Sequence, residues 1–280
     1  MNTNISDFVK CKDFLFCIDS DGCAIDTMDI KHIRCFGPCM VDEWGLSEWK
    51  APILTRWNEV NLYTMTRGIN RFKGLAKALR EVHEKYVNID GIEVLENWVE
   101  ETNELSNNAL KRAIEINDNI CLKKALSWSI KVNESINQLS FEDKRPFEGV
   151  KEALAYASQF GDIAIVSSAN MQAVVEEWEE HHLLEYVDII LAQDAGTKAY
   201  CIQELLKKGY DKDKVLMTGD APGDLDAAKK NDVLYYPILV RNENASWKEF
   251  KEVAVGNVVD GIYKGDYQNE KIDLFIKNLS

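Results

Sequence analysis

Acidic side chains follow short apolar runs at two places in this chain. In FLFCIDSDG, Asp19 and Asp21 come directly after five apolar residues. In KVLMTGDAPGD, Asp220 and Asp224 come after a second apolar run. A carboxylate beside a buried segment is costly unless a counter-charge or a metal compensates it. Carboxylate oxygens suit Mg²⁺, which uses few protein carboxylates and keeps several waters. The two stretches therefore indicate a magnesium site.

Two hydroxyl groups and one lysine follow other apolar runs. Ser167 and Ser168 come directly after IAIV, and Lys198 begins a helical stretch after VDIILAQ. A serine hydroxyl and the backbone N–H groups at a helix start can hold phosphate oxygens. A lysine nearby adds positive charge close to the carboxylates and the phosphate. Because function gathers at the carboxyl ends of strands in an open parallel sheet, we expect all these groups at one edge.

The segments that must position these groups are predicted to be strands that alternate with helices. Helical stretches such as GVKEALAYASQ and AVVEEWEEHHLLEY separate the apolar runs. This alternation predicts an α/β fold, with a parallel sheet covered by helices on both faces. Pro237 lies inside the last run, which predicts an edge strand or an interruption there. The expected strands are residues 14–18, 163–166, 187–193, 214–220 and 234–240.

A second region differs from this pattern. Residues 27–143 are almost wholly helical, with apolar residues spaced three and four apart. We therefore expect an inserted all-α domain at 27–143 and a sheet domain formed by 1–26 and 144–280. Within the insert, residues 31–80 hold nine Lys or Arg against four Asp or Glu.

The basic stretch 31–80 allows two interpretations. Arg67 and Arg71 lie four apart and could share a helix face that meets an anionic group of a substrate. Alternatively, the arginines are solvated and the tryptophans of this stretch fill the core of the insert. For each single residue the second interpretation is favoured, while the region as a whole remains the expected place of substrate contact. The tryptophans are Trp44, Trp49 and Trp57.

The bulk composition excludes several classes of function. The 280 residues carry a net charge of −14, which argues against nucleic acid or an anionic membrane as a partner. No apolar run approaches the roughly 20 residues that span a bilayer, and the N-terminal stretch lacks the apolar core of a secretory signal. Seven scattered cysteines suit a reducing compartment. We therefore expect a cytoplasmic protein without a membrane partner.

Four motifs in order resemble those of the haloacid dehalogenase-like hydrolase superfamily, in its phosphatase branch with an inserted helical cap. The motifs are CIDSDG, AIVSSAN, GTKAY and MTGDAPGD. RPFEGVKEAL also resembles the family's return from cap to core. The resemblance implies a Rossmann-like core and a cap at 27–143, and it covers residues 13–26 and 144 to about 240. The insert matches in position and helical character only.

The resemblance also implies a role for each motif residue. Asp19 is the expected nucleophile that forms an aspartyl-phosphate. Asp21 is the expected general acid and base, and its backbone carbonyl is expected to contact the metal. Asp220 and Asp224, with Asp19, are the expected Mg²⁺ ligands. The remaining expectations are phosphate binding by Ser167 and the Ser168 N–H, and stabilisation of the anionic nucleophile by Lys198.

The chain departs from the family pattern at one position, where Cys23 stands in place of the usual threonine. A thiol is a weaker hydrogen-bonding group than a hydroxyl, so we expect the turn at Cys23 to be tuned and the activity to be kept.

Two other reactions of the superfamily are disfavoured. The presence of Asp21, Asp220 and Asp224 argues against dehalogenation. Asp21 also disfavours a phosphonatase, which would need a cap lysine such as Lys31.

Two further alternatives stay open. A sugar-phosphate mutase shares every core residue named and differs by protecting the phospho-aspartate from water. A non-catalytic metabolite-binding protein is the other alternative, although such proteins usually lose a nucleophile or a metal ligand.

The expected activity is that of a Mg²⁺-dependent phosphatase for a small phosphorylated metabolite, since an inserted lid over the site limits access of bulky substrates. A sugar phosphate, a phosphoglycolate-like acid and a nucleotide all fit, and so do a monomer and a homodimer.

Overall fold

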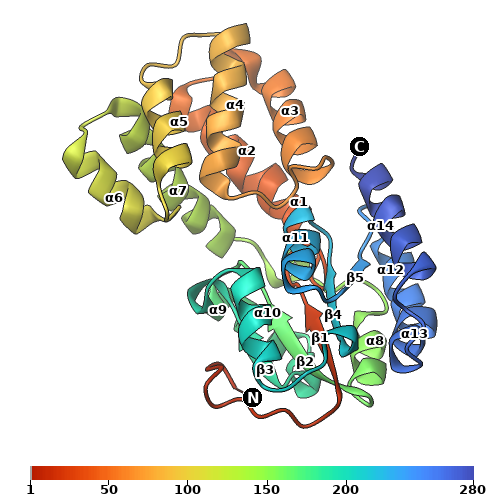
Figure 1. The fold of residues 1–280 in the computed structure, drawn as a ribbon. Helices are drawn as coiled ribbons and strands as arrows, with labels where there is room; N and C mark the ends of the chain where they lie inside the picture. Colours follow the sequence, from red (N-terminus) through yellow and green to blue (C-terminus); the bar gives the residue numbers. More distant parts are fainter. Residues whose placement is uncertain (1) are drawn as a thin grey trace. The chain divides into compact units, whose positions relative to one another are not determined.

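The computed structural model describes residues 2–280 of the chain, which form two compact units (Figure 1). We call Met1–Met28 together with Phe141–Ser280 the sheet unit, and Asp29–Ser140 the helical unit. Each unit has its own cluster of buried apolar side chains. Across the described residues, no helix combines the length and the apolar character needed to cross a membrane.

The sheet unit contains a five-stranded parallel sheet in the order β3-β2-β1-β4-β5. This arrangement confirms the predicted α/β fold class. β1 lies at the centre, where its residues Leu15 to Ile18 are fully buried. β5 forms an edge and ends at Pro237, as predicted for a residue without a backbone N–H. The strands are β1 Phe14–Ile18, β2 Gly161–Val166, β3 Ile189–Leu191, β4 Val215–Gly219 and β5 Leu234–Pro237.

Helices cover both faces of this sheet. Phe16 and Ile18 of β1 join one apolar core with α8, α9 and α12. The other helix pair, α10 and α11, packs together and lies against β2, β4 and β5. The helices of the sheet unit are α8 Val150–Ala157, α9 Met171–Glu180, α10 Lys198–Leu206, α11 Pro222–Asn231, α12 Glu243–Glu249, α13 Val255–Val259 and α14 Asp266–Asn278. A π-helical turn, η7 (Phe250–Ala254), joins α12 to α13.

The helical unit packs around a cluster of aromatic side chains. The rings of Trp57 and Trp128 lie 6.2 Å apart edge to face, and Phe36 and Phe72 pack around Trp128. The helices that supply this cluster are α2 Gly37–Trp44, α3 Lys50–Leu62, α4 Arg71–Lys85, α5 Ile92–Glu101, α6 Asn107–Ile116 and α7 Ile120–Asn137. A short helix, α1 (Met28–Lys31), and a π-helical turn, η1 (His32–Phe36), lead into α2.

The structure decides between the two interpretations of the tryptophans. Trp57 is buried in the core of the helical unit. Trp44 and Trp49 are partly buried and pack against the outside of this core. The expectation that Arg67 and Arg71 share a helix face is wrong. α4 begins at Arg71, because the side chain of Asn70 caps the helix by accepting a hydrogen bond from the Phe72 N–H. Arg67 therefore belongs to the preceding turn.

The centre of the sheet provides a first test. Gly161 lies opposite Phe14 in β1, and a Cβ on Gly161 would sit 2.6 Å from the Phe16 ring. We expect Gly161→Ala to lower the free energy of unfolding by about 1–3 kcal/mol through overpacking. Gly256 in α13 has open space around it, so Gly256→Ala should raise the same quantity by about 0.5–1 kcal/mol. Urea unfolding of both variants measures the difference, and an equal effect would contradict this packing.

Candidate active site

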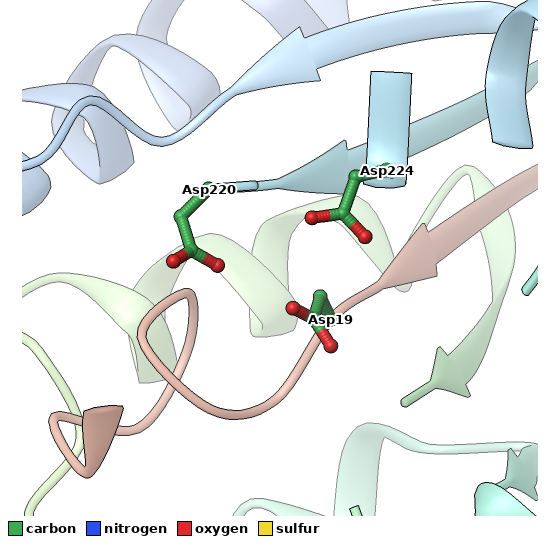
Figure 2. Close-up of side chains that lie close together, drawn as sticks. All are labelled: Asp19, Asp220 and Asp224. Carbon is green, nitrogen blue, oxygen red and sulfur yellow. The ribbon is translucent and has the colours of Figure 1, made fainter. Parts of the chain in front are cut away.

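Three aspartates converge at the carboxyl edge of the sheet (Figure 2). Asp19 directly follows β1, Asp220 directly follows β4, and Asp224 lies in the first turn of α11. One carboxylate oxygen of each lies within 4.8 Å of the other two, and all three side chains are buried. The convergence follows from topology, because β1 and β4 are neighbours and the Asp19 N–H donates to the Thr218 carbonyl at 3.0 Å.

Lys198 lies between two of these aspartates. Its Nζ is 2.8 Å from Asp19 Oδ1 and 2.5 Å from Asp224 Oδ1. The position of Lys198 is set by helix capping, since it is the first residue of α10 and the Thr197 side chain caps that helix. The second carboxylate oxygen of Asp224 accepts a hydrogen bond from the Ala221 N–H at 3.0 Å. Both oxygens of Asp224 are therefore held in place.

Burial and charge shape the protonation of this group. Burial raises the pKa of Asp19 to about 6, although Lys198 opposes that shift. Burial likewise raises the pKa of Asp224 to about 6 against the same opposition. For Lys198, burial favours a lower pKa, but the two carboxylates outweigh it and raise the pKa above its usual range. Lys198 bridges two of the three carboxylates, and the whole donor set of hard oxygens fits a divalent cation such as Mg²⁺.

The two serines end the neighbouring strand. Ser167 follows β2, which pairs with β1, and its N–H donates to the Leu191 carbonyl at 2.9 Å. The Ser167 side chain is buried, whereas Ser168 is exposed. Neither serine caps α9, because the side chain of Asn170 accepts the capping bond from the Gln172 N–H. Ser167 is therefore placed at the sheet edge by its strand and not by a helix cap.

The loop after Asp19 folds into a tight turn. The Ser20 carbonyl accepts hydrogen bonds from the N–H groups of residues 23, 24 and 25, and Gly22 has a positive φ of 79°. Asp21 Oδ1 accepts a hydrogen bond from Thr27 Oγ1 at 2.8 Å. The group of converging carboxylates found within residues 2–280 does not include Asp21. Cys23, the departure from the family pattern, donates its thiol to the Thr218 carbonyl at 3.7 Å.

Two tryptophans hold this loop from a distance in sequence. The indole N–H of Trp178, in α9, donates to Ser20 Oγ at 2.9 Å. The indole N–H of Trp247, in α12, donates to the Cys23 carbonyl at 2.8 Å. Both tryptophans are fully buried. The sequence contains no signal for these contacts. Trp178 and Ser20 are 158 positions apart, Trp247 and Cys23 are 224 positions apart, and no motif links either pair.

The chain matches the sequence profile of a family described as haloacid dehalogenase-like hydrolase over residues 69–236. That range includes Ser167, Lys198, Asp220 and Asp224, whereas Asp19 precedes it. No curated protein matches the chain significantly.

Two solved structures have the same fold. A haloacid dehalogenase-like family hydrolase from Streptococcus pneumoniae is 14% identical, with a TM-score of 0.50 over 85% of this chain and 90% of that one. A candidate phosphoglycolate phosphatase from Lactobacillus delbrueckii is 15% identical, with a TM-score of 0.50 over 81% of this chain and 86% of that one.

The contact of Trp247 with the loop can be tested by Trp247→Phe. The variant leaves the buried Cys23 carbonyl without its donor and opens a void, so the free energy of unfolding should fall by about 2–4 kcal/mol. Trp98→Phe is the matched control in the helical unit, where the indole packs edge-on against Phe72 and has no hydrogen-bond partner among residues 2–280. It should cost less than about 1.5 kcal/mol by chemical denaturation. Equal losses would show that the indole N–H of Trp247 contributes nothing.

Proposed function

Because the chain belongs to the haloacid dehalogenase-like hydrolase family, we propose that it is a Mg²⁺-dependent phosphatase acting on a small phosphorylated metabolite. The observation that supports this most directly is the buried group of Asp19, Asp220 and Asp224 with Lys198 bridging two of them. The candidate phosphoglycolate phosphatase with the same fold agrees with this proposal. In this proposal the sheet unit performs catalysis, and the helical unit is the cap that selects the substrate.

Asp19 is the nucleophile in this proposal. Its carboxylate oxygen attacks phosphorus, the bond from phosphorus to the ester oxygen breaks, and an aspartyl-phosphate forms. Lys198, 2.8 Å from Asp19 Oδ1, favours the ionised carboxylate that the attack requires. Lys198 also offsets negative charge that develops on the phosphoryl oxygens.

Asp21 transfers the protons in this proposal. It gives a proton to the departing ester oxygen, and then removes one from the water that attacks the aspartyl-phosphate. Inorganic phosphate leaves, and the Asp19 carboxylate is regenerated. The hydrogen bond from Thr27 Oγ1 gives the Asp21 side chain a defined orientation in the structure. The partial exposure of Asp21 suits a group that must exchange protons with water.

The remaining residues bind the transferred group and the metal. In this proposal Ser167 Oγ and the Ser168 N–H, which follow the end of β2, bind phosphoryl oxygens. Asp19, Asp220 and Asp224 would hold Mg²⁺, together with the backbone carbonyl of Asp21. When bound, Mg²⁺ supplies positive charge that stabilises the phosphoryl transition state.

Replacement of the nucleophile tests the reaction. We expect Asp19→Asn to lower phosphate release from a panel of phosphomonoesters by at least about 10³-fold, because an amide cannot form the aspartyl-phosphate. Asp226→Asn is the control, since Asp226 is exposed and pairs with Lys230 on the outer side of α11. Colorimetric phosphate release with and without Mg²⁺ measures both variants. Full activity in Asp19→Asn, or none in the native protein towards any ester, would overturn the proposal.

Metal binding can be tested without catalysis. With pKa values raised to about 6, Asp19 and Asp224 are protonated in the folded metal-free protein between about pH 4 and 6, while the unfolded chain has lost those protons. The stability that these two groups contribute is therefore highest below about pH 4 and is lost as the pH rises through about 6.

Mg²⁺ binds the deprotonated groups, so it should raise the melting temperature more at about pH 7.5 than at about pH 5. Scanning calorimetry at both pH values measures the shift. Asp220→Asn should abolish it and Asp226→Asn should keep it. A shift that is equal at both pH values, or one that persists in Asp220→Asn, would argue against this metal site.

A further inference from the structure

A groove of 470 Å³ lies along α6 and α7, which are neighbours in the helical unit (Figure 1). Its lining includes Ile114 of α6 and Leu126, Ser127 and Ile130 of α7. Ile130 is 41% exposed, and Ile116, where α6 ends, is at 89% the most exposed large apolar side chain of residues 2–280. Apolar side chains that gather in one exposed place are typical of a surface that binds another molecule.

α7 carries two stripes of side chains on opposite sides of the helix. The inner stripe is buried in the core of the helical unit and consists of Cys121, Ala125, Trp128 and Val132. The outer stripe has alternating spacings of three and four and consists of Ile120, Lys123, Ser127, Ile130 and Glu134. This spacing is that of the seam along which two helices pack in a coiled coil. The outer side of α7 therefore has the pattern of a second helix contact.

The charged side chains along the groove differ in their partners. Lys131 Nζ lies 2.6 Å from Glu43 Oε2 of the same unit, and Lys123 pairs with Asp118. Glu134 is exposed, and no basic side chain among residues 2–280 forms an ion pair with it. An occupant of the groove that brings a basic group to Glu134 would therefore add an ion pair to the apolar contact.

A second copy of α7, packed antiparallel to the first, supplies that basic group. If Lys123 faces Glu134 of the second copy, then Ser127, four residues further on, faces Ile130, four residues before Glu134. The short serine leaves room for the isoleucine, and the three donors of the Lys123 ammonium allow it to bond Glu134 as well as Asp118. Two-fold symmetry repeats both contacts on the other side of the axis. The outer stripe is therefore complementary to itself.

We propose that the outer side of α7 is a self-association surface, on which two copies of the chain form a two-fold symmetric dimer with antiparallel α7 helices. The distribution of charge agrees with this occupant. Residues 27–143 hold 15 basic and 18 acidic side chains, so most of the net charge of −14 lies outside the region that makes the contact. Salt screens the repulsion between charges that are more than roughly 8 Å apart. The dimer does not depend on the proposed phosphatase function.

Sedimentation velocity of the full chain, from about 1 to 200 µM, measures the association. We expect the native chain to form a dimer within this range. Ile130→Glu should remain monomeric, because it places a carboxylate in the middle of the contact. Ile262→Glu is the matched control, since Ile262 is an exposed isoleucine of the sheet unit, and it should dimerise like the native chain. Melting temperatures check that each variant is folded.

Reversal of charge tests the antiparallel pairing. Lys123→Glu and Glu134→Lys each place like charges opposite one another, so each should raise the dimer dissociation constant by roughly 5- to 50-fold. The variant that carries both changes has opposite charges again and should return to within about threefold of the native value. Lys77→Glu, which changes an exposed lysine of α4 outside the groove, is the control and should leave the dissociation constant unchanged.

Three outcomes would overturn the proposal. A native chain that stays monomeric up to about 200 µM would show that the groove is not filled by a second copy. A dimer that persists in folded Ile130→Glu would place the contact elsewhere on the molecule. A dimer that both single charge reversals weaken, and that the double reversal does not restore, would exclude the antiparallel packing of α7.

Discussion

Charge compensation by Lys198 is the contact on which the rest of the site depends. A lysine shared between Asp19 and Asp224 lowers the cost of burying both carboxylates. The surrounding backbone is adapted to this close packing. A Cβ on Gly219 would lie 2.2 Å from Asp224 Cγ, so only glycine lets the first turn of α11 approach β4 so closely. The same close packing brings the three carboxylates near enough to hold the metal ion that we propose for this site.

The loop that presents Asp19 and Asp21 is held by neutral donors. Trp178 and Trp247 each contribute one indole N–H from the face of the sheet that carries α8, α9 and α12. A charged donor in their place would change the electrostatic balance of the carboxylates nearby, because interactions between charges are strong in a buried environment. Indole groups fix the turn while they fill the apolar core with large rings, so the stability of the sheet unit and the geometry of the loop depend on the same side chains.

Much of the sheet unit could be predicted because its strands are buried on both faces and read as continuous apolar runs. The convergence of Asp19 and Asp220 followed from the rule that parallel strands end at one edge, and Lys198 followed from its place at a helix start. Other features depend on contacts that no local pattern encodes. The indole bonds of Trp178 and Trp247 arise from tertiary packing, and the shared helix face expected for Arg67 and Arg71 failed because Asn70 starts α4 between them.

The overall negative charge of the chain would oppose binding of the phosphate ester that we propose as its substrate, so local donors would have to provide the attraction. Residues 27–143 hold 15 basic and 18 acidic side chains, which leaves most of the net charge of −14 on the remainder of the chain. Salt screens such charges beyond roughly 8 Å, whereas fixed donors in partly buried places act at short range. Because two carboxylates already share Lys198, we expect much of the local attraction to come from the cation that the three aspartates are proposed to hold.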